Sequence, residues 1–114
     1  MRLPNPDKLV VEREEIEDYL LNPAHRFGAS KARFFVGLRF RLEEWERLAE
    51  ALREHGRINE VANTQETGFG PRYVVEGDLN SPSSRCPRVR TVWQMDQGAV
   101  APRLISAYPL EAEL

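Results

Sequence analysis

The chain has 114 residues, 41% of them hydrophobic and 30% charged, with a formal net charge of −2, as in an ordinary soluble globular protein. This length suits one domain with one modest core, so we predict a single domain over 1–114. The lone Cys86 excludes an intrachain disulfide, and no apolar run approaches the roughly 18 residues of a membrane-spanning helix, so we expect a cytoplasmic protein without membrane contact.

Three helices are predicted in the first half of the chain. Within 12–22, apolar residues recur at helical spacing among acidic ones, and Pro23 ends the pattern. A second, short helix is expected over 30–38, because a serine at its start can cap it. A third is expected over 41–55, with Gly56 just past its end. The third helix should bury one stripe, which consists of Leu42, Trp45, Leu48, Ala49 and Leu52.

The second half of the chain changes to the pattern of β-strands. Four strands are predicted, over 58–66, 72–79, 88–95 and 103–108, and turns that contain glycine and proline separate the last three from their neighbours. Helices followed by closely spaced strands predict an α+β domain. In it, three N-terminal helices pack on a four-stranded antiparallel β-meander.

The turn between the first two helices, NPAHRFGASK, carries cations and no acid. His25 can titrate near neutral pH and transfer protons, although a histidine on the surface is the alternative. Lys31 falls in the first turn of the second helix, where free N–H groups and an ammonium group suit a phosphate. A lysine that extends into water is the alternative there. His55, at the expected end of the third helix, is predicted to be structural.

Arginines line one face of a predicted strand. Alternation places Arg88 and Arg90 on one face and Thr91 on the other, which carries the core-facing residues. Guanidinium groups on a sheet face suit phosphate binding, and a solvated basic face is the alternative. Neither paired cysteines nor an HExxH motif occurs, so we expect no metal and no cofactor.

The string LNPAHRFGASKARFF is similar to the LNPxHPxGxxKAxxF pattern of a family of small uncharacterised bacterial proteins, whose members also occur as C-terminal domains of polymorphic toxins. RYVVEG, RVRTVW and APRLISAYP resemble the strand motifs of that family, so the resemblance covers about residues 3 to 109. The layout also looks like the barnase–EndoU–colicin–RelE group of metal-independent ribonucleases. This resemblance implies a nuclease toxin accompanied by an antitoxin or immunity protein.

Carried over by position, the resemblance matches the family's histidine to His25, its turn glycine to Gly28 and its helix-start lysine to Lys31. Its strand residues match Arg72, Arg90, Thr91 and the closing Ala107, Tyr108 and Pro109. The chain departs from the pattern in two places. Arg26 replaces a proline, and Ser106 replaces a threonine but keeps the hydroxyl.

The sequence therefore predicts a metal-independent RNA endonuclease toxin. RNA supplies the 2′-OH nucleophile, so the protein must supply a base, an acid and cations. His25 is expected to be the base or acid, with Tyr108 or a second group as its partner, while Lys31 and Arg90 stabilise the phosphate. Thr91 or Ser106 would orient the phosphate. The expected substrate-binding residues are Arg26, Arg72, Arg88 and Ser106.

Two other functions stay open at this point. The basic patch could bind RNA or an acidic protein without catalysis. The chain could also be an antitoxin, an immunity-type partner or a structural subunit, with the patch incidental. Convergence of His25, Lys31 and a strand arginine on one concave site would favour the enzyme.

Overall fold

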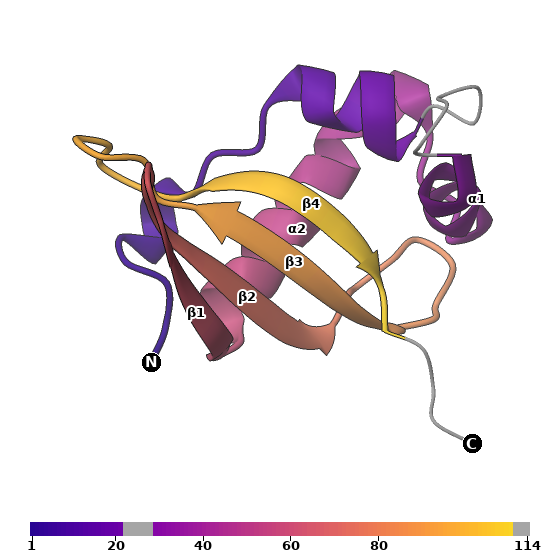
Figure 1. Ribbon diagram of the computed structural model, residues 1–114. Helices are drawn as coiled ribbons and strands as arrows, with labels where there is room; N and C mark the ends of the chain where they lie inside the picture. The colour runs from indigo at the N-terminus through magenta and orange to yellow at the C-terminus, as the bar shows by residue number, and fades with distance from the viewer. Residues whose placement is uncertain (22–28, 111–114) are drawn as a thin grey trace.

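The computed structural model describes residues 1–21 and 29–110, apart from the side chains of residues 19 and 29–31. It has an α+β fold with a four-stranded antiparallel sheet, which confirms the predicted class (Figure 1). The helical elements are η1 (Pro6–Lys8), η2 (Glu15–Leu20), α1 (Ala29–Gly37), η3 (Leu42–Glu44) and α2 (Trp45–Ile58). The strands are β1 (Val61–Thr67), β2 (Gly70–Asp78), β3 (Arg88–Gln94) and β4 (Arg103–Pro109).

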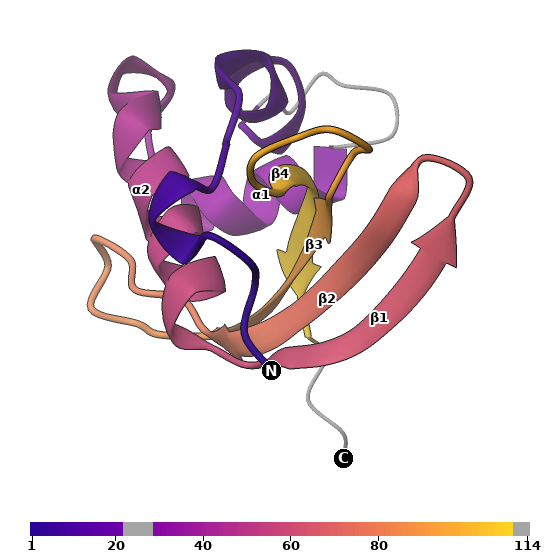
Figure 2. The same cartoon turned by 90° about the vertical axis from the view of Figure 1, so that its left-hand side faces the viewer.

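The sheet is a meander whose spatial order equals its chain order, β1-β2-β3-β4. Its register places Glu76 of β2 opposite Arg90 of β3, and Arg90 opposite Tyr108 of β4. A bulge in the pairing of β3 with β4 lies between Val92 and Trp93. One helix, α2, runs along one face of the sheet, while the other face carries no helix among the described residues (Figure 2).

The prediction that three N-terminal helices pack on the sheet is confirmed only in part. The first is a π-helix, Glu15–Leu20, and together with α1 it contacts β4. Among the described helices, α2 alone packs against both central strands, β2 and β3. The third predicted helix starts as the single 3₁₀ turn η3 and continues to Ile58, so Gly56 lies inside α2. A Cβ at Gly56 would come within 2.8 Å of the Trp93 ring, which explains a glycine in mid-helix.

The core lies between α2 and the sheet. Leu48 and Leu52 of α2 are fully buried, as is Trp93 of β3. The predicted stripe is wrong at its N-terminal end, because Leu42 is 47% exposed and Trp45 is only partly buried. Leu42 belongs to η3 and Trp45 is the first residue of α2, so both precede the buried part of the stripe, which begins at Leu48. None of the helices among residues 1–21 and 29–110 is both long enough and apolar enough to cross a membrane.

Candidate functional site

The face of the sheet opposite α2 gathers polar side chains from all four strands. A hollow of about 380 Å³ lies on this open face. Its lining residues are Asn63, Gln65, Arg72, Val74, Glu76, Arg90, Val92 and Tyr108. Ser106 pairs with Val92 in the register, and Arg88 alternates with buried Val89, so both belong to the same face. The structure thus brings Arg72, Arg90 and Tyr108 together.

Arg90 lines this hollow and contacts two other lining residues, Glu76 and Tyr108. Its Nε and Nη2 atoms lie 2.8 and 2.6 Å from Oε2 of Glu76. Its Nη1 donates to the hydroxyl of Tyr108 at 3.3 Å, and its Cζ lies 5.6 Å from the centroid of the Tyr108 ring. The hydrogen bonds with Tyr108 and with Glu76 raise the pKa of Arg90 above its usual value. The guanidinium is therefore charged at all physiological pH values and is held in one orientation.

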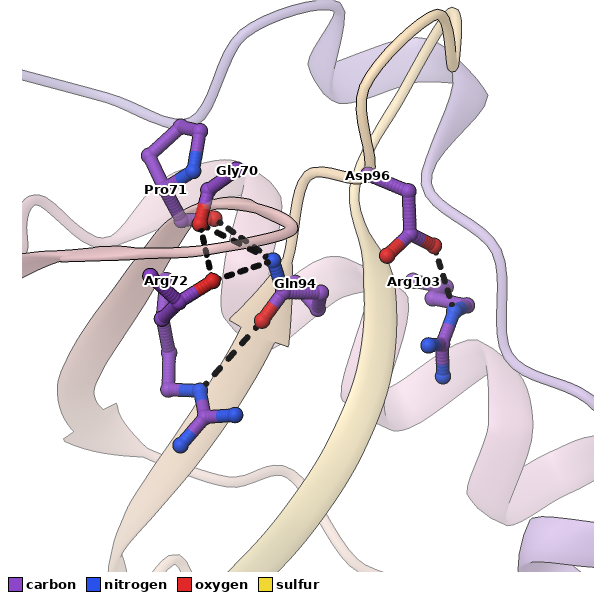
Figure 3. A network of polar contacts seen from close by, with 7 residues as sticks. Gly70, Pro71, Arg72, Gln94, Asp96 and Arg103 are labelled. Carbon is purple, nitrogen blue, oxygen red and sulfur yellow. Dashed lines mark hydrogen bonds and ion pairs between the residues drawn. The ribbon is translucent and has the colours of Figure 1, made fainter.

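Arg72 is connected to the β1–β2 turn through Gln94. The Nε of Arg72 donates to Oε1 of Gln94 at 3.4 Å, and Nε2 of Gln94 donates to the carbonyl oxygens of Gly70 and Pro71 (Figure 3). In the same region of the open face, the Nε of Arg103 lies 2.8 Å from Oδ2 of Asp96 (Figure 3). Two ion pairs and one amide thus position Arg90, Arg103 and Arg72 on this face.

Thr91 lies on the other face of β3, and the structure does not bring it to Arg90. Its side chain is fully buried under α2. Its Oγ1 accepts a hydrogen bond from Nε1 of Trp93 at 2.8 Å and lies 3.0 Å from Nδ1 of His55. Side chains alternate across a strand, so neighbouring residues 90 and 91 cannot face one substrate.

His55 lies in the last turn of α2, as predicted, and its ring is buried against the sheet. Its Nε2 lies 2.8 Å from the carbonyl oxygen of Val89 and 3.1 Å from that of Gly77. Since carbonyls only accept, Nε2 carries the proton, and Nδ1 accepts from the hydroxyl of Thr91. Burial lowers the pKa of His55, although the two carbonyls oppose this effect. The ring is therefore a neutral part of the core.

Several predicted site residues lie outside the described part of the chain. His25, Arg26 and Gly28 fall within residues 22–28, and Lys31 belongs to α1, but its side chain is outside the description. Convergence of these residues with Arg90 therefore stays a prediction. Among residues 1–21 and 29–110, no group of three His, Cys, Asp or Glu side chains could hold a metal ion.

The sequence-based reasoning missed Glu76 as a site residue. In RYVVEG, strict alternation from Arg72 through Val74 reaches Glu76, so the signal for a shared face was present. Its pairing with Arg90 depends on the register between β2 and β3, which joins residues far apart in sequence.

A family profile described as a domain of unknown function, DUF6883, matches residues 2–111. A search of curated proteins finds none that matches the chain. A chain from a contact-dependent growth inhibition toxin–immunity protein complex of Klebsiella pneumoniae 342 has a similar structure, with a TM-score of 0.68 and 15% sequence identity. The similarity covers 94% of this chain and 97% of that chain. At this identity the similarity concerns the fold.

Proposed function

The chain belongs to the DUF6883 family of domains of unknown function, and we propose that it is a metal-independent RNA endonuclease toxin whose open sheet face binds the RNA backbone. The observation that carries the proposal is Arg90, held between a carboxylate and a phenol, with Arg72 lining the same hollow. Fixed cations beside proton-transfer groups are what cleavage through the 2′-OH requires. The resemblance of the fold to a chain from a toxin–immunity complex supports the toxin role.

The proposed reaction is an internal transesterification of RNA. Glu76 accepts the proton of the 2′-OH as its oxygen bonds to phosphorus, and Arg90 stabilises the negative charge that develops on the phosphoryl oxygens. The bond from phosphorus to the 5′-oxygen breaks, and an acid returns a proton to that oxygen. Tyr108 lies within hydrogen-bonding distance of Arg90, and His25 is the second candidate for this acid. The products are a 2′,3′-cyclic phosphate and a 5′-hydroxyl.

On this proposal the substrate is RNA and the compartment is the cytoplasm. RNA is the partner that supplies the nucleophile, and cytoplasmic RNA is the pool that such a toxin would meet. An immunity protein or antitoxin would protect the producing cell if it covered the open face and excluded RNA from Arg90. Such a partner would be expected to offer acidic groups, because the strand arginines of this face favour them.

A second candidate function is a non-catalytic binding module, which includes an immunity-type protein. One observation favours it: Glu76 compensates Arg90 and Asp96 compensates Arg103, so much of the positive charge is already neutralised. A surface that presents charges of both signs can be complemented by the charges of a protein partner. The resembling chain also comes from a complex that contains both a toxin and its immunity protein.

The experiment that separates the two functions uses the purified protein, freed of any bound partner, with labelled total RNA in EDTA. The enzyme should cleave RNA and leave cyclic-phosphate ends that mass spectrometry detects. RNA that binds but stays intact would favour the binding module. Neither binding nor cleavage would reject RNA as the partner and favour a protein-binding role.

A further inference from the structure

A second hollow, of about 270 Å³, lies on the open face beside the first. Its lining residues are Phe69, Arg72, Gln94, Asp96, Arg103 and Ile105. Arg72 lines both hollows, so the second one directly adjoins the hollow that contains Arg90. A chain of nucleotides that passes over Arg90 could therefore extend into this second hollow, between two guanidinium groups.

Phe69 at the tip of the β1–β2 turn supplies the aromatic ring of this hollow. It is 76% exposed, more than any other large hydrophobic residue among those described. A single exposed hydrophobic residue is common and by itself indicates nothing. Here the exposed ring also lines a polar hollow that is bordered by Arg72 and Arg103.

The backbone that carries Phe69 is tied down on both sides. Its N–H donates to Oγ1 of Thr67 at 3.1 Å, and its carbonyl oxygen accepts from the backbone N–H of Gln97 at 2.9 Å. The next residue, Gly70, has a φ of 125°, and a Cβ there would come within 2.0 Å of the carbonyl oxygen of Met95. The turn therefore packs closely against the β3–β4 loop, which fixes the backbone position of Phe69.

Gln94 links this turn to the arginine between the two hollows. Its side chain is buried, and its Nε2 donates to the carbonyl oxygens of Gly70 and Pro71 at 3.1 and 3.4 Å (Figure 3). Its Oε1 accepts from the Nε of Arg72. One buried amide thus sets the spacing between the Phe69 turn and Arg72. A fixed spacing between the turn backbone and a cation reduces the conformational entropy that the site loses when a ligand binds.

We propose that Phe69 is a stacking platform for one unpaired base of the RNA, with Arg72 and Arg103 holding the phosphates on either side of that base. The inference rests on the proposed function, because it extends the same RNA path beyond Arg90. Aromatic rings beside cationic groups are how proteins bind single-stranded nucleic acid, since every base offers a flat face. The site selects single strands over duplexes, because bases inside a duplex are already stacked.

The test measures binding of a fluorescein-labelled single-stranded RNA decamer of mixed sequence. All of its 2′-OH groups are methylated, so that it cannot be cleaved through them. Phe69→Ala should weaken binding by about 5-fold to 100-fold, the range found for the loss of one stacked base. Phe69→Trp should retain affinity, and the fluorescence of the introduced indole should be quenched when the decamer binds. Val100→Ala is the matched control, because Val100 is an exposed apolar residue, at 63%, in the neighbouring β3–β4 loop.

The outcomes separate this inference from the proposed function. Wild-type protein that binds the decamer while Phe69→Ala binds equally well would overturn the stacking platform and leave the RNA-cleaving function standing. Weakening by Val100→Ala to the same extent would also overturn it, because the effect would then belong to the loops in general. Wild-type protein that binds no RNA would reject both. Circular dichroism of each variant verifies folding, which an exposed side chain should not affect.

Discussion

The hydroxyl of Thr91 lies 3.0 Å from Nδ1 of His55 and joins β3 to α2 in the interior of the protein. The same hydroxyl accepts from the indole N–H of Trp93, and Nε2 of His55 donates to backbone carbonyls of β2 and β3. Each buried polar side chain of this cluster therefore makes a hydrogen bond to another buried group. The cluster explains why a threonine and a histidine are tolerated in the core, and it gives both residues a structural role.

His55→Ala should destabilise the fold by about 2–4 kcal/mol. The substitution removes a buried ring and leaves a cavity. It also removes the acceptor of the Thr91 hydroxyl hydrogen and a donor to the Val89 carbonyl oxygen. Unfolding in urea, followed by circular dichroism, measures the change. Glu46→Ala on the exposed side of α2 is the control and should shift the midpoint little. Equal midpoints for the two variants would show that the cluster contributes no stability.

The free energy of unfolding should fall as the pH drops below about 6.5, the usual pKa of histidine. Burial lowers the pKa of His55 in the folded state, so the unfolded chain takes up a proton first and is stabilised by it. Above about pH 7 the residue is neutral in both states, so it no longer makes the free energy of unfolding depend on pH. Urea titrations between pH 5 and 8 measure the slope. His55→Gln should lack this part of the slope, and an unchanged slope in that variant would assign it to other groups.

Gly56→Ala should destabilise the protein, whereas Gly37→Ala should be neutral or slightly stabilising. A Cβ at position 56 would come within 2.8 Å of the buried Trp93 ring, but at position 37 no atom lies within 4 Å. Overpacking of this kind costs about 1–3 kcal/mol, and alanine in a helix returns up to ~1 kcal/mol. The melting temperatures of the two variants measure which effect is larger at each position. A Gly56→Ala variant as stable as Gly37→Ala would mean that Trp93 can shift at little cost.

Arg90→Ala should lower RNA cleavage by about 100-fold to 1000-fold, as expected for loss of a fixed group that stabilises transition-state charge. Arg90→Lys should recover only part of the rate, because an ammonium cannot reproduce the planar contacts to Glu76 and Tyr108. Arg47→Ala, an exposed arginine of α2 with the same charge change, is the control. Equal loss in Arg47→Ala and Arg90→Ala would indicate a general effect of charge and no site at Arg90.

His25→Ala should lower cleavage by at least ~100-fold if this histidine transfers a proton in the reaction. Lys31→Arg should retain more activity than Lys31→Ala, because the charge near the phosphate matters more than its exact geometry for a lone cation. The measurement is the initial rate of cleavage of labelled RNA in EDTA. Cleavage by His25→Ala at the wild-type rate would leave Tyr108 as the remaining candidate acid.

The sequence by itself determined the fold class and the faces of the strands. Period-two alternation is a local property, so it already separated Arg88 and Arg90 from the core-facing Thr91. The predicted strand boundaries agree with the observed ones within a few residues, because glycine and proline mark the turns.

Only the tertiary structure decided which residues meet. The register of β2, β3 and β4 aligns Glu76, Arg90 and Tyr108, and no local pattern encodes a register between distant segments. Gly56 lies inside α2 because a Cβ at this position would meet the Trp93 ring, and His55 is buried where its ring contacts backbone carbonyls of β2 and β3. These features depend on contacts between residues far apart in the chain, and such contacts override local propensity.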